Sequence, residues 1–310
     1  MSFEHNFRDC IIQLNTTPSD FLEDSEGNTA TINKLLDEKG FVLVRGLSGA
    51  KNIDQVKSIL TTCLGGELIE YNYRSTPRKS LGGNVYTATE YHSDVTIPQH
   101  NENAYSNNYP MRLGFYCVVP SKIGGRTPIA DSVAIYNKIP KDIRDEFERK
   151  EIKYVRNYSN IDLPWQEVFN SDHKEDVEKY CANNNIEFAW LKDGSLRTSQ
   201  VNPASRLHPK HEVPVWFNQA HLFHVSNLDP ELRETLISTV GEEGLPRNTF
   251  FGDGSPICEQ QLDEIRKIID AEKISFAWLA GDMLLIDNMR YTHGREPFEG
   301  KRQLLVGMSL

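Results

Sequence analysis

The chain has 310 residues, with 34 basic and 44 acidic side chains and a net charge of -10. This acidic balance argues against a nucleic-acid partner, because phosphate binding needs a concentrated basic surface. The first ten residues lack a basic start followed by an apolar stretch, and no run of about 18 apolar residues occurs. We therefore expect a cytoplasmic protein with neither a signal peptide nor a membrane helix.

The cysteines are few and widely spaced. They number five, an odd count, and none is paired in a Cys-x-x-Cys motif. This pattern predicts reduced, mostly buried thiols, and it indicates neither a zinc site nor a disulfide framework.

The first half of the chain alternates between helix and strand signals. Thr29 is a candidate cap for a helix that ends at Gly40, and the apolar stretch 41–47 follows directly as a buried strand. A further helix is expected over 52–66, where it closes on a glycine pair. Strands are then expected at 112–120 and within the glycine-rich stretch 124–132.

The second half contains most of the helical signals. Helices are expected at 140–151, 164–169, 175–184, 229–240 and 258–273, with strands at 187–201 and 213–218 between them. Three strand candidates end the chain, at 274–288, 290–294 and 302–310. Strands at both ends predict a mainly β, antiparallel core in which late strands pair with early ones. The helices of roughly 140–270 would form an insertion within a single domain, 1–310.

Several common enzyme motifs are missing from the sequence. It contains no His-Glu-x-x-His, no Gly-x-Ser-x-Gly, no phosphate-binding loop and no Gly-x-Gly-x-x-Gly. The usual zinc protease, serine hydrolase and nucleotide-binding interpretations therefore have no support.

Histidines and carboxylates offer an alternative in the form of a three-ligand metal site. His100 and Glu102 lie two apart, so on a strand or at its end their side chains share a face. Two imidazoles and one carboxylate on one side of Fe(II) leave the other side open for a co-substrate and O₂. His293 is the candidate third ligand, and Arg302 follows it by nine residues.

Other histidine sets compete with this assignment. His92 and Asp94 have the same spacing, and two His-x-x-His pairs also occur, His208 with His211 and His221 with His224. The His-x-Glu motif also occurs often by chance on exposed loops, where it has no functional meaning. We expect His221 and His224 to be hydrogen-bonded structural histidines or to line a pocket. We expect Trp216 and Phe217 to belong to the core, with substrate contact as the alternative.

Five stretches of the sequence resemble a known family. They are "YRSTPR" (73–78), "IPQHNENAY" (97–105), "PMRLGFYCVVPSKIGGRTPIADS" (110–132), "VWFNQAHLFH" (215–224) and "WLAGDMLLIDNMRYTHGREPFEGKRQLL" (278–305). Together they resemble the TauD/TfdA family of Fe(II)/2-oxoglutarate dioxygenases, in the branch of clavaminate synthase and the syringomycin-pathway aspartate hydroxylase. The last stretch is the most specific and the first is the weakest.

The resemblance implies a fold and a set of site residues. The fold would be a double-stranded β-helix (jelly roll) of the clavaminate synthase type. The iron ligands fall on His100, Glu102 and His293, which favours this set over His92 and Asp94. Arg302 and Thr127 fall where the family binds 2-oxoglutarate.

The remaining expectations concern the substrate and outer residues. Arg74, Arg78 and Arg295 are candidates for a substrate carboxylate, with surface ion pairs as the alternative. Asp287 and Asn288 would brace the loop that carries His293. No catalytic residue beyond the metal ligands is expected.

The resemblance also implies the reaction and the substrate class. O₂ and 2-oxoglutarate would be consumed in the hydroxylation, desaturation or cyclisation of an amino acid or amino-acid-derived metabolite. This small molecule would be free or tethered to a carrier protein, in specialised metabolism. Two other interpretations stay open, a metal-dependent hydrolase that uses the same ligands and a non-catalytic jelly-roll binding protein.

Overall fold

A computed structural model describes residues 8–14, 16–50, 52–71, 73, 75–76, 78–88, 91–159 and 161–310. Among the residues singled out above, Arg74 lies outside these ranges.

A six-stranded sheet forms the base of the molecule, in the order β1-β2-β14-β5-β17-β3. Its strands are β1 (Ile11–Gln13), β2 (Phe41–Arg45), β3 (Tyr86–Thr87), β5 (Arg112–Val119), β14 (Met283–Asp287) and β17 (Gln303–Ser309). β14 pairs antiparallel with both β2 and β5, and β17 pairs antiparallel with β5. The expected pairing of late strands with early ones is confirmed.

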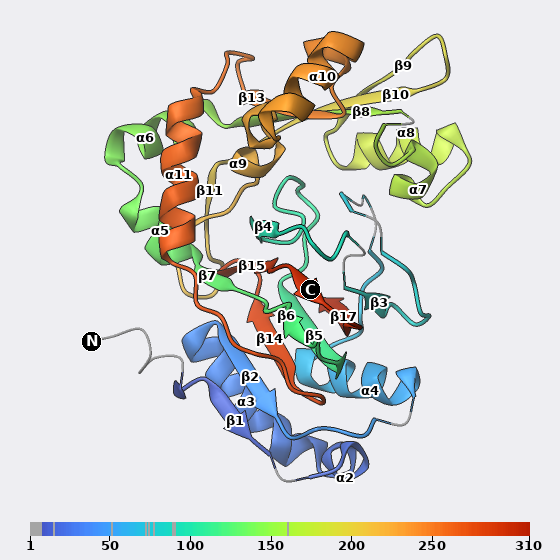
Figure 1. Ribbon diagram of the computed structural model, residues 1–310, viewed down its shortest axis with the longest axis vertical. Helices are drawn as coiled ribbons and strands as arrows, with labels where there is room; N and C mark the ends of the chain where they lie inside the picture. Colours follow the sequence, from blue (N-terminus) through green and yellow to red (C-terminus); the bar gives the residue numbers. More distant parts are fainter. Residues whose placement is uncertain are drawn as a thin grey trace.

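Three N-terminal helices cover one face of this main sheet (Figure 1). They are α2 (Pro18–Glu23), α3 (Ser25–Lys39) and α4 (Ile53–Leu64). The proposed cap at Thr29 is wrong, because α3 begins at Ser25 and the Thr29 hydroxyl donates to the Ser25 carbonyl inside the helix. Gly40 does end α3, in the left-handed conformation (φ 83°) that glycine tolerates best.

The main sheet is buried on both faces, and its side chains alternate between them. On β2, Val42 and Val44 pack with the helices, whereas Phe41 and Leu43 face the other side. β14 divides in the same way. Burial on both faces explains why these strands appear in the sequence as continuous apolar runs.

A smaller sheet packs on the second face and carries the candidate site. It has the order β4-β15-β7, with β4 (Ile97–His100), β7 (Ile129–Asp131) and β15 (Tyr291–Arg295). Ile129 of β7 belongs to the same apolar cluster as Phe115 and Leu284 of the main sheet. A short antiparallel pair is formed by β6 (Ile123–Gly124) and β16 (Phe298–Glu299). Along the chain β6 precedes β7, and β16 follows β15.

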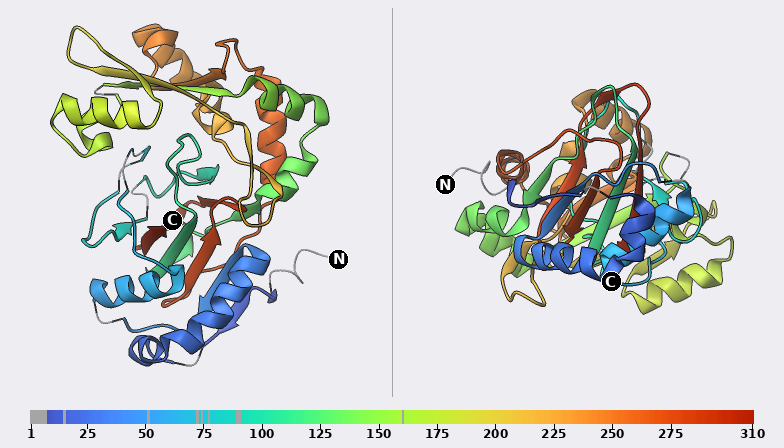
Figure 2. Two further views of the ribbon diagram at one scale, coloured as in Figure 1. Left: turned by 180° about the vertical axis from the view of Figure 1, so that it is seen from behind. Right: turned by 90° about the horizontal axis from the view of Figure 1, so that it is seen from below.

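Most of the segment between β7 and β14 lies in the upper part of the molecule (Figures 1 and 2). Its helices are α5 (Ser132–Lys138), α6 (Lys141–Lys150), α7 (Trp165–Phe169), α8 (Lys174–Asn183), α9 (Ala220–Phe223), η1 (Val225–Asn227), α10 (Pro230–Val240), η2 (Glu242–Gly244) and α11 (Glu259–Ala271). Its strands are β8 (Ile152–Tyr158), β9 (Glu187–Trp190), β10 (Leu196–Asn202), β11 (Ser205–Leu207), β12 (Pro214–Trp216) and β13 (Arg247–Phe251). Four of them form a separate antiparallel sheet, β13-β8-β10-β9, so the segment is not only helical.

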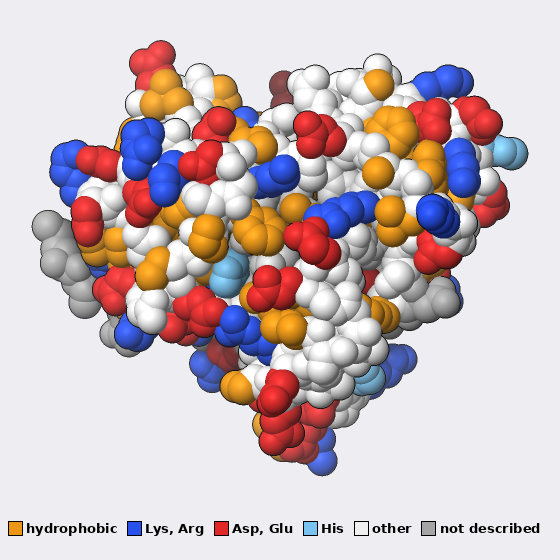
Figure 3. Space-filling model, turned by 90° about the horizontal axis from the view of Figure 1, so that it is seen from above, with side chains coloured by type: hydrophobic (Ala, Val, Ile, Leu, Met, Phe, Trp, Pro, Cys, Tyr) orange, Lys and Arg blue, Asp and Glu red, His pale blue; other side chains and the backbone are white. Residues whose placement is uncertain are grey.

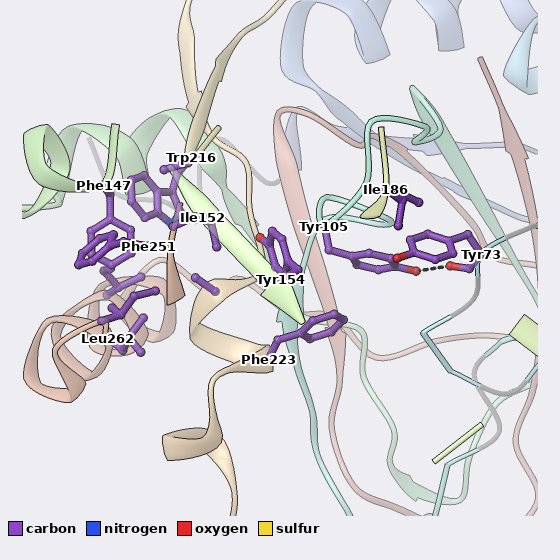
Figure 4. Close-up of a cluster of buried hydrophobic side chains, with 14 of the residues drawn as sticks. Tyr73, Tyr105, Phe147, Ile152, Tyr154, Ile186, Trp216, Phe223, Phe251 and Leu262 are labelled. Atoms are coloured by element: carbon purple, nitrogen blue, oxygen red, sulfur yellow. Dashed lines mark hydrogen bonds between the residues drawn. The ribbon is translucent and has the colours of Figure 1, made fainter. Parts of the chain in front are cut away.

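The core of this segment reaches the loop that follows β4. Phe147, Phe251 and Trp216 lie at one end of the cluster, and Tyr105 lies at the other, where its hydroxyl donates to the Tyr73 carbonyl (Figure 4). Tyr105 is three residues beyond Glu102. Packing of the inserted segment therefore fixes the chain next to the candidate metal site, and Trp216 is confirmed as a core residue.

Acidic and basic side chains are interspersed on the face seen from above (Figure 3). Every helix in the described part of the chain is either too short or too polar to span a lipid bilayer.

The two-sided burial of the main sheet predicts a large cost for a cavity in it. Leu285→Ala removes a side chain that is 0 % exposed, and we expect a loss of about 2–5 kcal/mol in the free energy of unfolding. Leu232→Ala on α10, where the side chain is 49 % exposed, is the control and should change it by less than about 0.5 kcal/mol. Chemical denaturation measures both values, and equal losses would contradict this account of the core.

Candidate metal centre

His100, Glu102 and His293 come together on the small sheet. His100 ends β4 and lies directly opposite His293 of β15 in the antiparallel register, and the two ring centroids are 4.4 Å apart. Glu102 follows two residues later, with Oε2 3.6 Å from His293 Nε2. One possible ligand atom from each residue lies within 4.8 Å of the other two. Small adjustments would bring all three to one ion.

His100 is in the protonation state that a metal needs. Its Nδ1 lies 2.8 Å from the Pro98 carbonyl, which can only accept, so Nδ1 carries the proton and the Nε2 lone pair is available as a ligand. Burial, with a contribution from His293, lowers the pKa of His100 to about 3. The ring is therefore neutral at physiological pH, as metal binding requires.

Two side chains hold the carboxylate of Glu102. The Tyr71 hydroxyl donates to Oε1 at 2.9 Å and Arg78 Nη2 donates to Oε2 at 2.5 Å. Burial alone would raise the pKa of this carboxyl group, but Arg78 and the two imidazoles outweigh it and lower the pKa well below its usual value. Glu102 is thus an ionised carboxylate in a fixed orientation.

Asn288 fixes the backbone of Glu102. Its Oδ1 accepts from the Glu102 N–H at 2.7 Å, and its Nδ2 donates to the Glu102 carbonyl at 3.0 Å. Asp287 accepts from the N–H groups of Met289 and Arg290 and so shapes the turn before β15. The expectation that Asp287 braces the turn before His293 is confirmed. Asn288 instead braces the loop that carries Glu102.

Glycine is required between His293 and Arg295. A Cβ at Gly294 would lie 2.7 Å from the Ile97 carbonyl oxygen, on the neighbouring strand β4. Only glycine therefore allows β15 to approach β4 closely enough for His293 to meet His100.

A cavity opens beside the two histidines. Its lining residues are Arg78, Ala88, Ile97, His100, Phe115, Thr127, His293, Gly294, Arg295, Arg302 and Leu304. Arg302 donates through Nε to the Gly125 carbonyl at 3.0 Å and through Nη2 to the Thr127 hydroxyl at 3.4 Å. Thr127 also accepts from the Trp278 indole N–H. The sequence-predicted co-substrate residues thus share a cavity with the two histidines.

Of the two cations at this end of the cavity, Arg295 is buried and Arg302 is half-buried. Burial, and next the nearby Arg295, lowers the pKa of Arg302 to about 10. Arg302 nevertheless stays charged at neutral pH, so this part of the cavity attracts an anion.

The competing histidine sets lie elsewhere. His92 and Asp94 are on an exposed loop before β4. His221 and His224 are buried and hydrogen bonded, to the Gln99 carbonyl and the Ser226 hydroxyl respectively. Phe217 is fully buried in a small apolar cluster, as expected of a core residue.

His208, His211 and Asp287 form a second cluster of possible ligands. His208 Nδ1 accepts from the N–H groups of Lys210 and His211, so the proton lies on Nε2, which donates to Asp287 at 2.9 Å. Both ring nitrogens are therefore engaged in hydrogen bonds. At His100, in contrast, Nδ1 carries the proton and Nε2 is available. The hydrogen bonds of His208 are typical of a structural link between the β11–β12 loop and β14.

The candidate substrate arginines have other contacts in the structure. Arg78 pairs with Glu102, and Arg295 donates to the backbone carbonyls of Tyr91, His92 and Val95. The sequence analysis missed Tyr71 as a partner of Glu102. Its place two residues before the "YRSTPR" stretch was the one available signal.

Residues 12–309 match the model of a protein family that is described as "Taurine catabolism dioxygenase TauD, TfdA family". The chain belongs to this family. The resemblance found in the sequence is confirmed, and with it the expectation of a dioxygenase that uses Fe(II) and 2-oxoglutarate.

Two curated relatives cover most of this dioxygenase. The dapdiamide synthesis protein DdaC of Enterobacter agglomerans is 42 % identical over 278 residues, which is 89 % of this chain and 84 % of DdaC. A clavaminate synthase-like protein of Arabidopsis thaliana is 30 % identical over 290 residues, 89 % of this chain and 83 % of the relative.

A solved structure with a similar fold is PvcB, described as an Fe, alpha-ketoglutarate dependent oxygenase from an isonitrile synthetic pathway. The TM-score is 0.54 at 14 % sequence identity, covering 96 % of this chain and 84 % of PvcB. At this identity the likeness concerns the fold alone.

The buried histidines predict acid sensitivity of the metal-free protein. Burial lowers the pKa values of His221 and His224 from 6.5 to about 4. Between these values the unfolded chain binds more protons than the folded protein, so acidification favours unfolding, by up to about 1.4 kcal/mol per pH unit for each histidine.

The measurement is the free energy of unfolding from about pH 7 to about pH 5. His221→Gln should reduce its pH dependence, whereas His173→Gln, at an exposed position, should not. An identical pH dependence in wild type and His221→Gln would contradict the predicted burial effect.

Proposed function

We propose that His100, Glu102 and His293 hold one Fe(II) in a jelly-roll core of the clavaminate synthase type. In this proposal the main and small sheets are the two halves of the jelly roll, and residues 1–310 form one catalytic domain. The inserted segment of roughly 140–270 packs against it. The neutral Nε2 of His100 and the ionised carboxylate of Glu102 support this ligand set.

We further propose that Arg302 and Thr127 bind the distal carboxylate of 2-oxoglutarate. The observation that carries the proposed function is that both residues line the same cavity as His100 and His293. A guanidinium and a hydroxyl there would hold one end of the molecule, while its 2-oxo acid end reaches the metal.

Fe(II) with 2-oxoglutarate and O₂ supplies an oxidant strong enough to remove hydrogen from an unactivated C–H bond, with release of succinate and CO₂. The protein's own residues orient the reactants. Tyr71 and Arg78 hold Glu102 by separate oxygens, and Phe115 packs against the His293 ring at 5.2 Å. These contacts fix the ligands and keep bulk water from one side of the site.

The substrate that we propose is an amino acid or amino-acid-derived metabolite of specialised metabolism. Support comes from the DdaC relative, whose name places it in dapdiamide synthesis. Hydroxylation is the proposed outcome, with desaturation or cyclisation as alternatives on the same scaffold. Whether the small molecule is free or carrier-bound would follow from assays with both forms.

A hydrolase using the same three ligands is the principal rival, and a non-catalytic binding protein is the other. A hydrolase has no use for a half-buried arginine and a buried threonine arranged beside the metal ligands. Substrate-stimulated release of succinate, with consumption of O₂, distinguishes the proposed enzyme from both.

The metal ligands can be tested by spectroscopy. Anaerobic protein with Fe(II) and 2-oxoglutarate should show a weak visible charge-transfer band, which His100→Ala and Glu102→Ala should abolish. His173→Ala removes an exposed histidine and should leave the band unchanged. A wild-type band in both ligand variants would reject this metal site.

The role of Arg302 can be tested by co-substrate kinetics. Arg302→Ala should raise the KM for 2-oxoglutarate more than it lowers kcat, because the residue contributes binding that is equal in the ground and transition states. Arg149→Ala, on the exposed side of α6, is the control. An unchanged KM in Arg302→Ala would refute the assignment.

A further inference from the structure

Arg295 is a second cation in the cavity that holds Arg302, and it is the more deeply buried of the two. It follows His293 by two residues on β15, so both side chains extend from the same face of the strand. The residue is 5 % exposed and lines the cavity.

Two of the three side-chain nitrogens of Arg295 donate hydrogen bonds to a loop, and the third does not. Nη1 donates to the Tyr91 carbonyl at 3.0 Å, and Nη2 donates to the carbonyls of His92 and Val95. These bonds fasten the loop before β4 to β15. The third side-chain nitrogen, Nε, is buried and has no hydrogen-bond partner among the described residues.

Arg295 forms no ion pair with any described carboxylate. Within the part of the chain that the structure describes, neither Arg295 nor Arg302 has a carboxylate within 4.0 Å, although Asp94 acts on Arg295 at longer range. Glu102, in contrast, is already paired with Arg78. Both Arg295 and Arg302 lie near the Phe298 ring, at 5.2 and 5.6 Å from its centroid. Two neighbouring cations with no counter-ion among the described residues, one buried and one half-buried, are costly, and an anion between them would lower that cost.

We propose that Arg295 acts with Arg302 to recognise the distal carboxylate of the co-substrate, through its free Nε–H and its charge. The pair makes the site selective for a dicarboxylic 2-oxo acid over a monocarboxylic one of the same length. This inference rests on the proposed function, since it assigns a second residue to the same co-substrate. In this proposal Arg295 binds the co-substrate and not the substrate, and its buried Nε–H donates to the distal carboxylate.

The experiment compares two 2-oxo acids that differ only in the distal group. Binding of 2-oxoglutarate and of 2-oxopentanoate to Mn(II)-loaded protein is measured by calorimetry, without O₂ or turnover. Arg295→Met should weaken 2-oxoglutarate about tenfold or more and change 2-oxopentanoate by less than about twofold, because only the former carries the distal charge. Arg295→Lys keeps the charge and should retain part of the selectivity.

The ratio of the two affinities separates recognition from loop fastening. An equal loss for both acids in Arg295→Met, or no loss for either, would overturn the proposal. If Arg295→Met does not fold, Arg295→Lys and Arg295→Gln decide: a higher selectivity in Lys than in Gln supports the proposal, and equal selectivity rejects it. Arg149→Met is the matched control.

Failure of the proposed function would look different. Wild-type protein would then show no preference for 2-oxoglutarate, and Arg302→Met would change nothing. A wild-type preference that is lost in Arg302→Met but kept in Arg295→Met would sink the Arg295 inference alone.

Discussion

The antiparallel register between β4 and β15 is the constraint on which the site depends. It places His100 opposite His293, and it requires Gly294 at the point where the two strands approach. Because Glu102 follows β4 by two residues, the same register brings the carboxylate to the pair. The surrounding helices and sheets act by holding these two strands: the main sheet packs against the small sheet, and the inserted segment packs against Tyr105.

Charge is arranged in two separate groups around this register. Glu102 is matched by Arg78 and by the Tyr71 hydroxyl, so its charge is compensated before any metal binds. Within the described ranges, Arg302 and Arg295, in contrast, make hydrogen bonds only to backbone carbonyls and one hydroxyl. A site that combines an ionised, ion-paired carboxylate with guanidiniums that have no described carboxylate partner is suited to a metal ion accompanied by an anionic co-substrate.

Local sequence signals predicted the elements that carry the ligands, and the family resemblance selected among the histidines. Spacing alone could not separate His100 and Glu102 from His92 and Asp94, because the difference is one of strand against exposed loop. The partnership of Tyr71 and Arg78 with Glu102 joins residues more than twenty positions apart, which no periodicity reveals. The sequence could not show which ring nitrogen of His208 carries the proton either, because this depends on hydrogen bonds from backbone N–H groups. Thr29 was misplaced because a threonine inside a helix resembles a cap.

The most direct test of the account is the position of iron in crystals grown anaerobically with Fe(II) and N-oxalylglycine. Anomalous scattering at the iron edge should give one peak at about 2.0–2.2 Å from His100 Nε2, a Glu102 oxygen and a His293 ring nitrogen. The distal carboxylate of the inhibitor should then lie against Arg302. A peak at His208, His211 and Asp287 instead, or none at the three proposed ligands, would contradict the central claim.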